Sequence, residues 1–542
     1  MYDVLVIGGG ITGAGAARDA AMRGLSTLLV EADDLASGTS SRSSKLVHGG
    51  LRYLEQGEFH LVFEAVSERR VLMDIAPHLV TPAPFLFPTY KGGRVGFLKL
   101  DVGMWLYDGL SLFRSPRLHR ALSPRQVALE EPGLLQEGLT GAPLYYDCAT
   151  DDARLTLENA LDARRLGAEV RTHTRVVGML HDGGGRIAGV RLRDAFSGAE
   201  SEVRARVVIN ATGPWTDRVR GLAGERRALL RPTRGVHLVV DAARLSPHNT
   251  LVCFHPRDGR LLFVLPWGDR SYVGTTDTDD AGDPALVHAT GDDVAYLLEA
   301  ANHYFPQASP LTPADVISTW AGLRPLLSGE GSESSVSREH EILVDPDGLI
   351  TIAGGKLTTF RKMAQQVVEQ AVALLRVTGA TESLARVGPA PTATTPLPGG
   401  VGWPEGVEDE HAAMTARILA AGGEAMTLET ARLFATTYGA RGVAVAERMA
   451  RDPSAAEALV PGRPERMAQV DVAVDEEFAQ RVGDVLVRRT QLHYRDHDQG
   501  LGCAEAVAAR MGARLGWDAE RVAAEVAHYR AEVALSRRWR SV

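Results

Sequence analysis

The chain has 542 residues, more than one hydrophobic core usually supports, so we expect two or three domains. Its 45% hydrophobic and 23% charged content are typical of a globular protein, and no apolar run approaches the ~20 residues needed to cross a bilayer. A net charge of −9 argues against nucleic acid as the main partner. The three cysteines lie far apart without zinc or iron–sulfur spacing, so we expect no metal site and a reducing compartment.

The first thirty residues follow the pattern of a dinucleotide-binding βαβ unit. An apolar run, Val4 to Ile7, predicts a buried strand, and Gly8, Gly10 and Gly13 follow at GxGxxG spacing. A helix of small residues and a second apolar run come next, ending at Glu31. Gly8 permits the tight turn, Gly10 lets the backbone approach a pyrophosphate, and Gly13 lets helix and strand pack closely. The helix N-terminus favours the pyrophosphate, and Glu31 is placed to accept hydrogen bonds from an adenosine ribose.

The motif begins at the second residue, so we expect no signal or transit peptide and a chain that folds in the cytosol.

Two later segments have both an ordinary and a functional interpretation. Residues 36 to 44 are small and polar, which favours a solvated linker, but a loop after the second Rossmann strand could hold a pyrophosphate or a ribityl chain. In VVINATGPWTD a buried strand runs into Ala211 to Gly213. Small residues there let the backbone approach a bulky ligand at the sheet's crevice, although an ordinary strand–turn–helix has the same pattern.

The middle of the chain alternates between helical and strand patterns. Apolar spacing predicts a surface helix from Phe59 to Met73, and DDARLTLENALDARRLGAEV predicts a capped helix from Asp151 to Gly167. LDVGMWLYDGL is apolar almost all round, and we expect a helix buried beneath a substrate domain rather than a membrane contact. Leu230 to Asp279 predicts an antiparallel sheet with glycine and proline turns.

The last third contains a strand, a long helix and a linker. The strand Leu349 to Ala353 leads into Gly354, Gly355 and Lys356, which open a helix whose apolar face starts at Phe360. A segment dense in proline, glycine and threonine, residues 388 to 404, predicts a linker, and the periodicity beyond it is helical.

Several motifs together resemble a known family. KLVHGGLRYLE, WAGLRPL and GGKLTTFRKM, with the N-terminal GGGITG and the ATGPW stretch, resemble FAD-dependent, aerobic-type glycerol-3-phosphate dehydrogenases. The resemblance covers nearly the whole chain, including VGDVLVRRTQLHY near its end. The C-terminal cysteine cluster of the anaerobic relative is absent. Related oxidases, which use oxygen, stay open, although the long insertion that some of them carry is not seen.

The resemblance implies an α/β fold with a Rossmann-like FAD-binding domain, an antiparallel-sheet substrate domain and a C-terminal all-helical domain. The expected FAD-binding domain is discontinuous, with residues 1–75, 151–230 and 320–388. Residues 76–150 and 231–319 would form the substrate domain, and residues 405–542 the helical domain. The oligomeric state stays open, with a homodimer among the alternatives.

The resemblance also implies a set of FAD contacts. Glu31 and the fingerprint glycines would hold the ADP half, and a helix N-terminus after the GGK motif would stabilise negative charge at the flavin N1 and O2. The implied cofactor-binding residues are Gly8, Gly10, Gly13, Glu31, Thr39, Ser40, Ser43, Ala211, Gly213, Gly354, Gly355 and Thr358.

The implied substrate is sn-glycerol 3-phosphate, oxidised at its C2 alcohol to dihydroxyacetone phosphate. A phosphate monoester requires several cations, and the candidate substrate-binding residues are Arg52, Tyr53, Arg338 and Lys356. Histidine suits the base that takes the hydroxyl proton, and both His48 and His237 qualify. Arg324 would stabilise the developing charge on the substrate oxygen.

Two other functions remain as alternatives. An amino-acid oxidase of the same flavin superfamily would explain the FAD motifs but would leave the cations unused. A non-catalytic flavoprotein scaffold would contain flavin that small alcohols and amines do not reduce.

Only one Rossmann fingerprint is present and no nicotinamide site is evident, so the reduced flavin needs a different acceptor. The family resemblance implies that this acceptor is a membrane quinone. The protein would then be cytoplasmic and bound peripherally to the inner face of the cell membrane. The candidate contact is the helix from Thr358, where Arg361 and Lys362 flank Phe360 and Met363. The same stripe would equally suit packing against the core.

Overall fold

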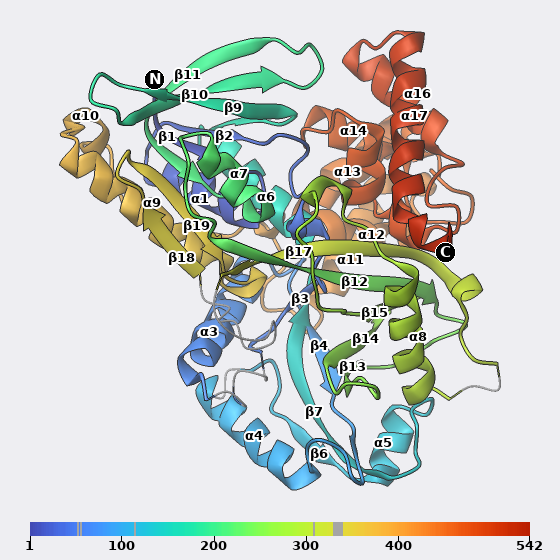
Figure 1. Ribbon diagram of the computed structural model, residues 1–542. Helices are drawn as coiled ribbons and strands as arrows, with labels where there is room; N and C mark the ends of the chain where they lie inside the picture. Colours follow the sequence, from blue (N-terminus) through green and yellow to red (C-terminus); the bar gives the residue numbers. More distant parts are fainter. Residues whose placement is uncertain (51–53, 55–56, 113–114, 307–308, 329–339, 542) are drawn as a thin grey trace.

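Two β-sheets and a set of C-terminal helices make up the molecule (Figure 1). The computed structural model describes residues 1–50, 54, 57–112, 115–306, 309–328 and 340–541. The α/β fold class expected from the sequence is confirmed, and the chain beyond residue 405 is helical as expected.

The first sheet is built around the N-terminal strand. Its strand order is β18-β19-β11-β1-β2-β8, with β1, β2, β8, β11 and β19 parallel and β18 antiparallel to β19. Strands β9 and β10 continue from β11 as an antiparallel extension. The bounds are β1 Tyr2–Ile7, β2 Thr27–Val30, β8 Glu169–Arg171, β9 Thr174–His181, β10 Ile187–Asp194, β11 Glu200–Asn210, β18 His340–Val344 and β19 Leu349–Gly354.

Helices α1 (Ile11–Met22), α6 (Asp152–Arg165) and α9 (Phe360–Val377) pack together over this sheet. The central strands are buried on both faces, which explains why β1 and β2 are continuous apolar runs. The side chain of Asp151 accepts a hydrogen bond from the Arg154 amide and caps α6 where the sequence predicted a cap.

The second sheet is mostly antiparallel and lies below the first in Figure 1. Its order is β16-β12-β15-β14-β13-β4-β7-β3, with β17 paired to β12 and with β5 and β6 paired to β7. The bounds are β3 Leu46–Val47, β4 Thr81–Leu86, β5 Thr89–Tyr90, β6 Arg120–Leu122, β7 Leu139–Ala149, β12 Leu230–Asp241, β13 Thr250–Phe254, β14 Leu261–Trp267, β15 Arg270–Gly274, β16 Thr278–Asp279 and β17 Val316–Leu327.

One strand of this sheet crosses the boundary expected for the substrate domain, and another lies outside that domain's expected ranges. Strand β17 crosses the predicted boundary at residue 320 and pairs along its length with β12. Strand β3, from the segment that follows the N-terminal Rossmann unit, pairs with β7. Both strands contribute residues to the junction of the two sheets, and the candidate site lies at this junction.

Helix α4 (Phe97–Leu110) differs from the expectation of a buried helix. Met104 and Tyr107 face the core, but Leu98, Val102 and Trp105 are 78%, 69% and 56% exposed. Its composition is apolar on both sides, so the sequence pattern did not distinguish the outer face from the inner one. The neighbouring helix α3 (Phe59–Ile75) forms where it was predicted.

The C-terminal segment packs against the second sheet and against helix α6, which covers the first sheet, rather than standing apart (Figure 1). One core cluster joins Trp320 and Tyr272 of the second sheet to Leu486, Leu492 and Tyr529 of the C-terminal segment. The remaining helices are α5 Pro124–Glu130, α7 Thr216–Gly221, α8 Gly291–Tyr304, α10 Thr381–Leu384, α11 Glu410–Gly422, α12 Leu428–Tyr438, α13 Gly442–Arg451, α14 Met467–Asp475, α15 Leu492–Arg495, α16 Ala504–Leu515 and α17 Ala519–Ser536.

Candidate active site

The glycine-rich turn after β1 has the backbone approach that its spacing predicts. Gly8 has a φ of 108°, which favours glycine, and a Cβ on Gly13 would lie 1.9 Å from the Gly8 carbonyl oxygen. Gly10 is the residue before helix α1, so the first amides of the helix face outward from the turn. The turn therefore offers a helix N-terminus with donors for a phosphate group.

Glu31 lies at the end of β2 beside this turn. Its carboxylate accepts hydrogen bonds from the amide of Gly9 at 2.6 Å and from the amide of Asp33 at 2.8 Å. Burial raises the pKa of Glu31 to about 7, against the lowering effect of the two amide donors. Each carboxylate oxygen has two lone pairs, so the group can still accept from ribose hydroxyls.

The small polar loop is a structured turn and not a solvated linker. Ser40 Oγ accepts from the Ile11 amide at 2.9 Å, and Thr39 Oγ1 donates to the Leu323 carbonyl in β17 at 2.6 Å. Ser43 donates through both its amide and its hydroxyl to Asp152, at 3.0 and 2.7 Å. These contacts hold the loop against α1, α6 and the second sheet.

Two later glycine-containing segments line the same cavity as the first glycine-rich turn. A Cβ on Gly8 would lie 2.7 Å from the carbonyl oxygen of Ala211, so Ala211 to Gly213 pass directly over the first turn. Gly354 and Gly355 both have positive φ, and a 3₁₀ turn, Leu357–Thr359, leads from them into α9. The predicted helix start is therefore present, preceded by this extra turn.

These segments line one cavity of about 1390 Å³. Pockets for drug-sized ligands measure roughly 300–1,000 Å³, so this larger cavity has room for a dinucleotide and a small substrate. Its lining begins at the glycine turn and Glu31, passes Ala211 to Gly213 and Gly354 to Thr358, and ends at the apolar inner side of α4. The phosphate-binding turn, the acidic residue and the two close backbone approaches all fit a dinucleotide.

Arg324, in β17, is held in the cavity by a set of polar neighbours. Its Nη1 donates to Asp277 Oδ1 at 3.0 Å, and its Nη2 donates to Thr275 Oγ1 at 3.0 Å and to the Thr276 carbonyl at 3.2 Å. A Cβ on Gly235 would lie 2.5 Å from Nη2, so this glycine provides the room for the guanidinium. Sequence reasoning identified Arg324 but missed Asp277 and Gly235, which lie far from it in the chain.

The two candidate histidines occupy different environments. His237 is buried, stacks on Trp320 with 4.8 Å between ring centroids, and has its Nε2 2.8 Å from Ser44 Oγ. Burial and the nearby cations of Arg324 and Lys45 lower the pKa of His237 well below its usual value, so it is neutral at pH 7. His48 is half-buried in the cavity wall.

His48 also connects the segment after the small polar loop to the GGK motif, Gly354 to Lys356. Its amide donates to Thr358 Oγ1 at 3.1 Å, and the Thr358 hydroxyl lies 3.1 Å from the His48 carbonyl oxygen. Lys356 lines the same part of the cavity. Three of the predicted substrate-binding residues, Arg52, Tyr53 and Arg338, lie outside the residues that the structure describes.

Helix α9 is not the exposed amphipathic element expected at a membrane. Phe360 and Met363 are buried in the core, and Arg361 forms a buried ion pair with Glu68 at 2.6 Å. The apolar stripe of α9 therefore packs against α1 and β19, the alternative that the sequence left open. Within the described residues, no helix combines the length and apolar character needed to cross a bilayer.

Two family models match the chain. Residues 3–359 match the family described as FAD dependent oxidoreductase, and residues 390–522 match the C-terminal domain of alpha-glycerophosphate oxidase.

Named relatives match nearly the full length. A glycerol-3-phosphate dehydrogenase of Mycobacterium leprae is 41% identical over 538 residues, covering 98% of this chain and 88% of that protein. The alpha-glycerophosphate oxidase of Streptococcus pyogenes is 37% identical over 586 residues, covering 96% of this chain and 93% of the oxidase. The structure of the glycerol-3-phosphate dehydrogenase from Bacillus halodurans complexed with FAD superposes with a TM-score of 0.80 at 32% identity, covering 99% and 95% of the two chains.

Proposed function

Because this chain belongs to the family of FAD-dependent oxidoreductases, with FAD as its cofactor, we propose that it oxidises sn-glycerol 3-phosphate to dihydroxyacetone phosphate and passes the electrons to a membrane quinone. The observation that carries the proposal is the convergence of Arg324, His48, His237 and Lys356 on one cavity beside the dinucleotide-binding turn. Full-length relatives named glycerol-3-phosphate dehydrogenase support the same substrate.

FAD, when bound, supplies the acceptor for the hydride that leaves C2. We assign the holding of FAD to the residues named from the sequence, from Gly8 to Thr358. The loop residues Thr39 and Ser43 act mainly by fixing the loop, since their hydroxyls already donate to Leu323 and Asp152.

His48 is the better candidate for the base. Both histidines line the cavity, but His48 is half-buried, whereas His237 is buried and its ring stacks on Trp320 and contacts Ser44. The base must reach the substrate hydroxyl within about 2.6–3.2 Å. We therefore assign proton abstraction at the C2 hydroxyl to His48, and orientation of the substrate to His237.

The cations divide between two tasks. Arg324, fixed by Asp277 and Thr275, lines the cavity and stabilises the charge that develops on the substrate oxygen. Lys356, with Arg52, Tyr53 and Arg338, binds the phosphate, because a dianion requires several donors. A substrate with only a carboxylate would leave part of this set unused.

The apolar end of the cavity supports a lipid-soluble acceptor. Leu100, Gly103 and Leu106 of α4 line it, and the outer face of the same helix carries Leu98, Val102 and Trp105 exposed. The same helix therefore contributes residues to the cavity wall and carries apolar residues on its exposed face. We propose that this face of α4, in place of α9, contacts the inner surface of the cell membrane, where a quinone can enter.

Nearby basic residues favour an anionic membrane. Lys91, Arg94 and Lys99 are exposed next to the apolar residues of α4, and Phe59 and Phe63 of the adjacent α3 are also exposed. Each basic residue near an anionic surface contributes about 1 kcal/mol of attraction at low salt.

An oxidase that uses oxygen is the second candidate. The alignment with the Streptococcus pyogenes oxidase extends over 586 residues, more than the 542 of this chain, so the oxidase contains residues that this chain lacks. That difference favours the dehydrogenase. The test is turnover of sn-glycerol 3-phosphate with a short-chain quinone and with oxygen. Fast quinone reduction without stoichiometric hydrogen peroxide supports the proposal, and stoichiometric peroxide with poor quinone reduction identifies the oxidase.

A further inference from the structure

The turn that carries Glu31 is anchored from the C-terminal helices. Asp34, three residues after Glu31, is fully buried, and its carboxylate accepts two hydrogen bonds from Arg489, at 2.6 and 2.8 Å, and one from Arg488 Nε at 2.5 Å. Both arginines come from the π-helical turn Asp484–Arg489, more than 450 residues away in sequence. A carboxylate buried between two arginines is rigidly held, since each group is costly to leave unpaired.

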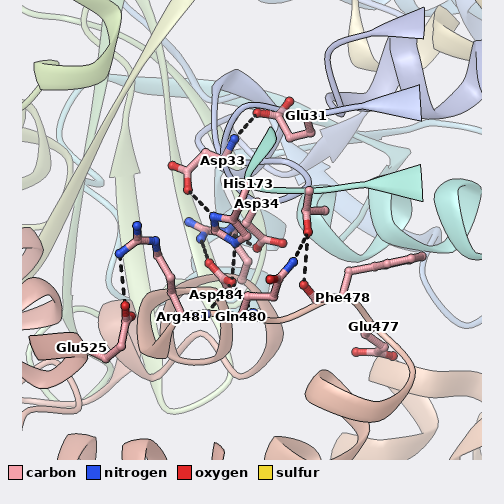
Figure 2. Close-up of polar contacts among 12 residues, drawn as sticks. Glu31, Asp33, Asp34, His173, Glu477, Phe478, Gln480, Arg481, Asp484 and Glu525 are labelled. Atoms are coloured by element: carbon pink, nitrogen blue, oxygen red, sulfur yellow. Dashed lines mark hydrogen bonds and ion pairs between the residues drawn. The ribbon is translucent and has the colours of Figure 1, made fainter. Parts of the chain in front are cut away.

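A second contact joins the same two segments (Figure 2). His173 lies between Asp33 and Asp484, with its Nδ1 3.5 Å from Asp33 Oδ1 and its Nε2 3.0 Å from Asp484 Oδ2. Asp484 Oδ2 also accepts from the amides of Gln480 and Arg481. Burial lowers the pKa of His173, but the carboxylates of Asp484 and Asp33 outweigh it and raise the pKa overall.

This cluster suits a protonated imidazole and not a metal ion. The two ring nitrogens of His173 point to different carboxylates on opposite sides of the ring. One ion therefore cannot lie between Nδ1 and Asp33 and also between Nε2 and Asp484. Asp484 also pairs with Arg488 at 2.8 Å. The carboxylate that a metal ion would need is therefore already shared with a second cation. The three groups form an ionic link from the Glu31 turn to the C-terminal segment.

The anchored turn contacts the dinucleotide site directly. The Asp33 amide donates to Glu31 Oε1, and the Asp33 carbonyl accepts from the His173 amide at 2.8 Å. The Ala36 amide donates to the carbonyl of Gly9 at 3.0 Å, and a Cβ on Gly9 would lie 2.7 Å from the Leu35 side chain. Movement of Asp34 would therefore displace both the ribose-binding carboxylate and the backbone of the phosphate-binding turn.

We propose that the C-terminal helical segment is a positioning element for the ADP half of FAD, acting through Arg488, Arg489 and His173 on the turn from Glu31 to Ser37. Arg489 and His173 are positioning residues that do not touch the cofactor themselves. This role rests on the family's cofactor and is independent of the substrate assigned above. It also gives the C-terminal helices a role in cofactor binding, although the glycine-rich turn that binds the dinucleotide lies at the other end of the chain.

The test compares two arginine-to-lysine variants of the full-length holoenzyme. Arg489→Lys keeps the charge but loses the two-point contact with Asp34. Arg441→Lys is the matched control, because Arg441 also reaches across to the sheet-covering helix α6, through Glu158 at 2.9 Å, without touching residues 31–37. The readout is the rate of FAD release from diluted holoenzyme, followed by the rise in flavin fluorescence, together with the melting temperature at saturating FAD.

The expected result is about a tenfold or greater acceleration of FAD release by Arg489→Lys, since a charge-assisted hydrogen bond is lost. Arg441→Lys should leave the rate of FAD release within about twofold of the wild-type rate. It should lower the melting temperature by about as much as Arg489→Lys does. Placed in a Glu31→Gln background, Arg489→Lys should accelerate release less than it does in the wild type, because the ribose contact through which it partly acts is already weakened. Equal acceleration by the two lysine variants, or the same effect of Arg489→Lys in both backgrounds, would overturn the proposal.

A second variant covers the case in which Arg489→Lys does not fold. His173→Gln removes the ionic link but keeps a hydrogen-bond donor at the same place. It should accelerate FAD release more in the wild-type background than in the Glu31→Gln background. Unchanged release from the folded His173→Gln enzyme would contradict the role assigned to this link.

Discussion

Arg324 and Asp277 form an ion pair in the lining of the candidate substrate cavity, with 3.0 Å between Arg324 Nη1 and Asp277 Oδ1. Arg324 comes from β17, and Asp277 follows the end of β15. Thr275 holds the other guanidinium nitrogen, and Gly235 leaves the space that the fork occupies. The orientation of the arginine is therefore set before any substrate arrives, which is what stabilisation of a developing charge requires.

Asp277→Asn should lower kcat/KM for sn-glycerol 3-phosphate by about tenfold to a hundredfold, because Arg324 loses its charged partner and its fixed orientation. FAD content should stay normal, since Asp277 faces Arg324 and not the glycine turn. Asp279→Asn is the control, because that residue pairs with Arg231 at the surface, where an ion pair contributes little. Steady-state kinetics with a dye acceptor measure both, and equal losses in the two variants would refute a specific role for Asp277.

The assignment of the base gives a second prediction. His48→Asn should reduce kcat by about 10²–10⁴-fold with FAD retained, because the proton acceptor is removed. His237→Asn should raise KM more than it lowers kcat, because His237 is assigned to orient the substrate. Its ring, enclosed by Trp320 and Ser44, is not the proposed proton acceptor. If the larger kcat loss falls on His237→Asn, the two roles are exchanged.

FAD retention should depend on pH through Glu31. Its pKa is raised to about 7, and ribose hydroxyls donate to the ionised carboxylate better than to the protonated acid. Binding of FAD therefore favours ionisation and lowers this pKa, so FAD should be released more slowly as the pH rises from 6 to 8 and should level off above that. Glu31→Gln should remove the dependence on pH. A persistent dependence in that variant would assign it to another group.

The exposed face of α4 predicts a specific loss of membrane binding. Val102→Glu places a charge at a position that is 69% exposed and should abolish binding to anionic vesicles while leaving activity with a soluble dye within about twofold. Leu129→Glu, at a 76% exposed position on α5, is the matched control and should bind like the wild type. Vesicle flotation at low and high salt measures this, and normal binding of Val102→Glu would exclude α4 as the contact.

Local patterns predicted those parts of the molecule that local chemistry determines. The strand, the glycine turn and Glu31 lie within one βαβ unit, so their spacing alone implied how they meet. The cap of α6 by Asp151 and the helical character of the C-terminal segment followed from equally local signals.

Other features depend on contacts between distant segments, which the patterns do not contain. Helix α9 has a strong apolar stripe, but the sequence could not distinguish a core from a bilayer, and Arg361 pairs with Glu68 in the interior. The bonds from Asp34 to Arg488 and Arg489 join residues more than 450 positions apart, and no local signal marks them. The sequence did not predict the exposed side of α4, because both faces of this helix are apolar.

The most direct test of the central claim is the absorbance of the bound FAD under anaerobic conditions. Adding one equivalent of sn-glycerol 3-phosphate should bleach the flavin band, whereas glycine, sarcosine and D-amino acids should leave it unchanged. In the His48→Asn variant the same addition should bleach it at least about a hundredfold more slowly. Rapid bleaching by an amine with no response to sn-glycerol 3-phosphate would identify an amino-acid oxidase, and no bleaching by any of these compounds would identify a non-catalytic flavoprotein.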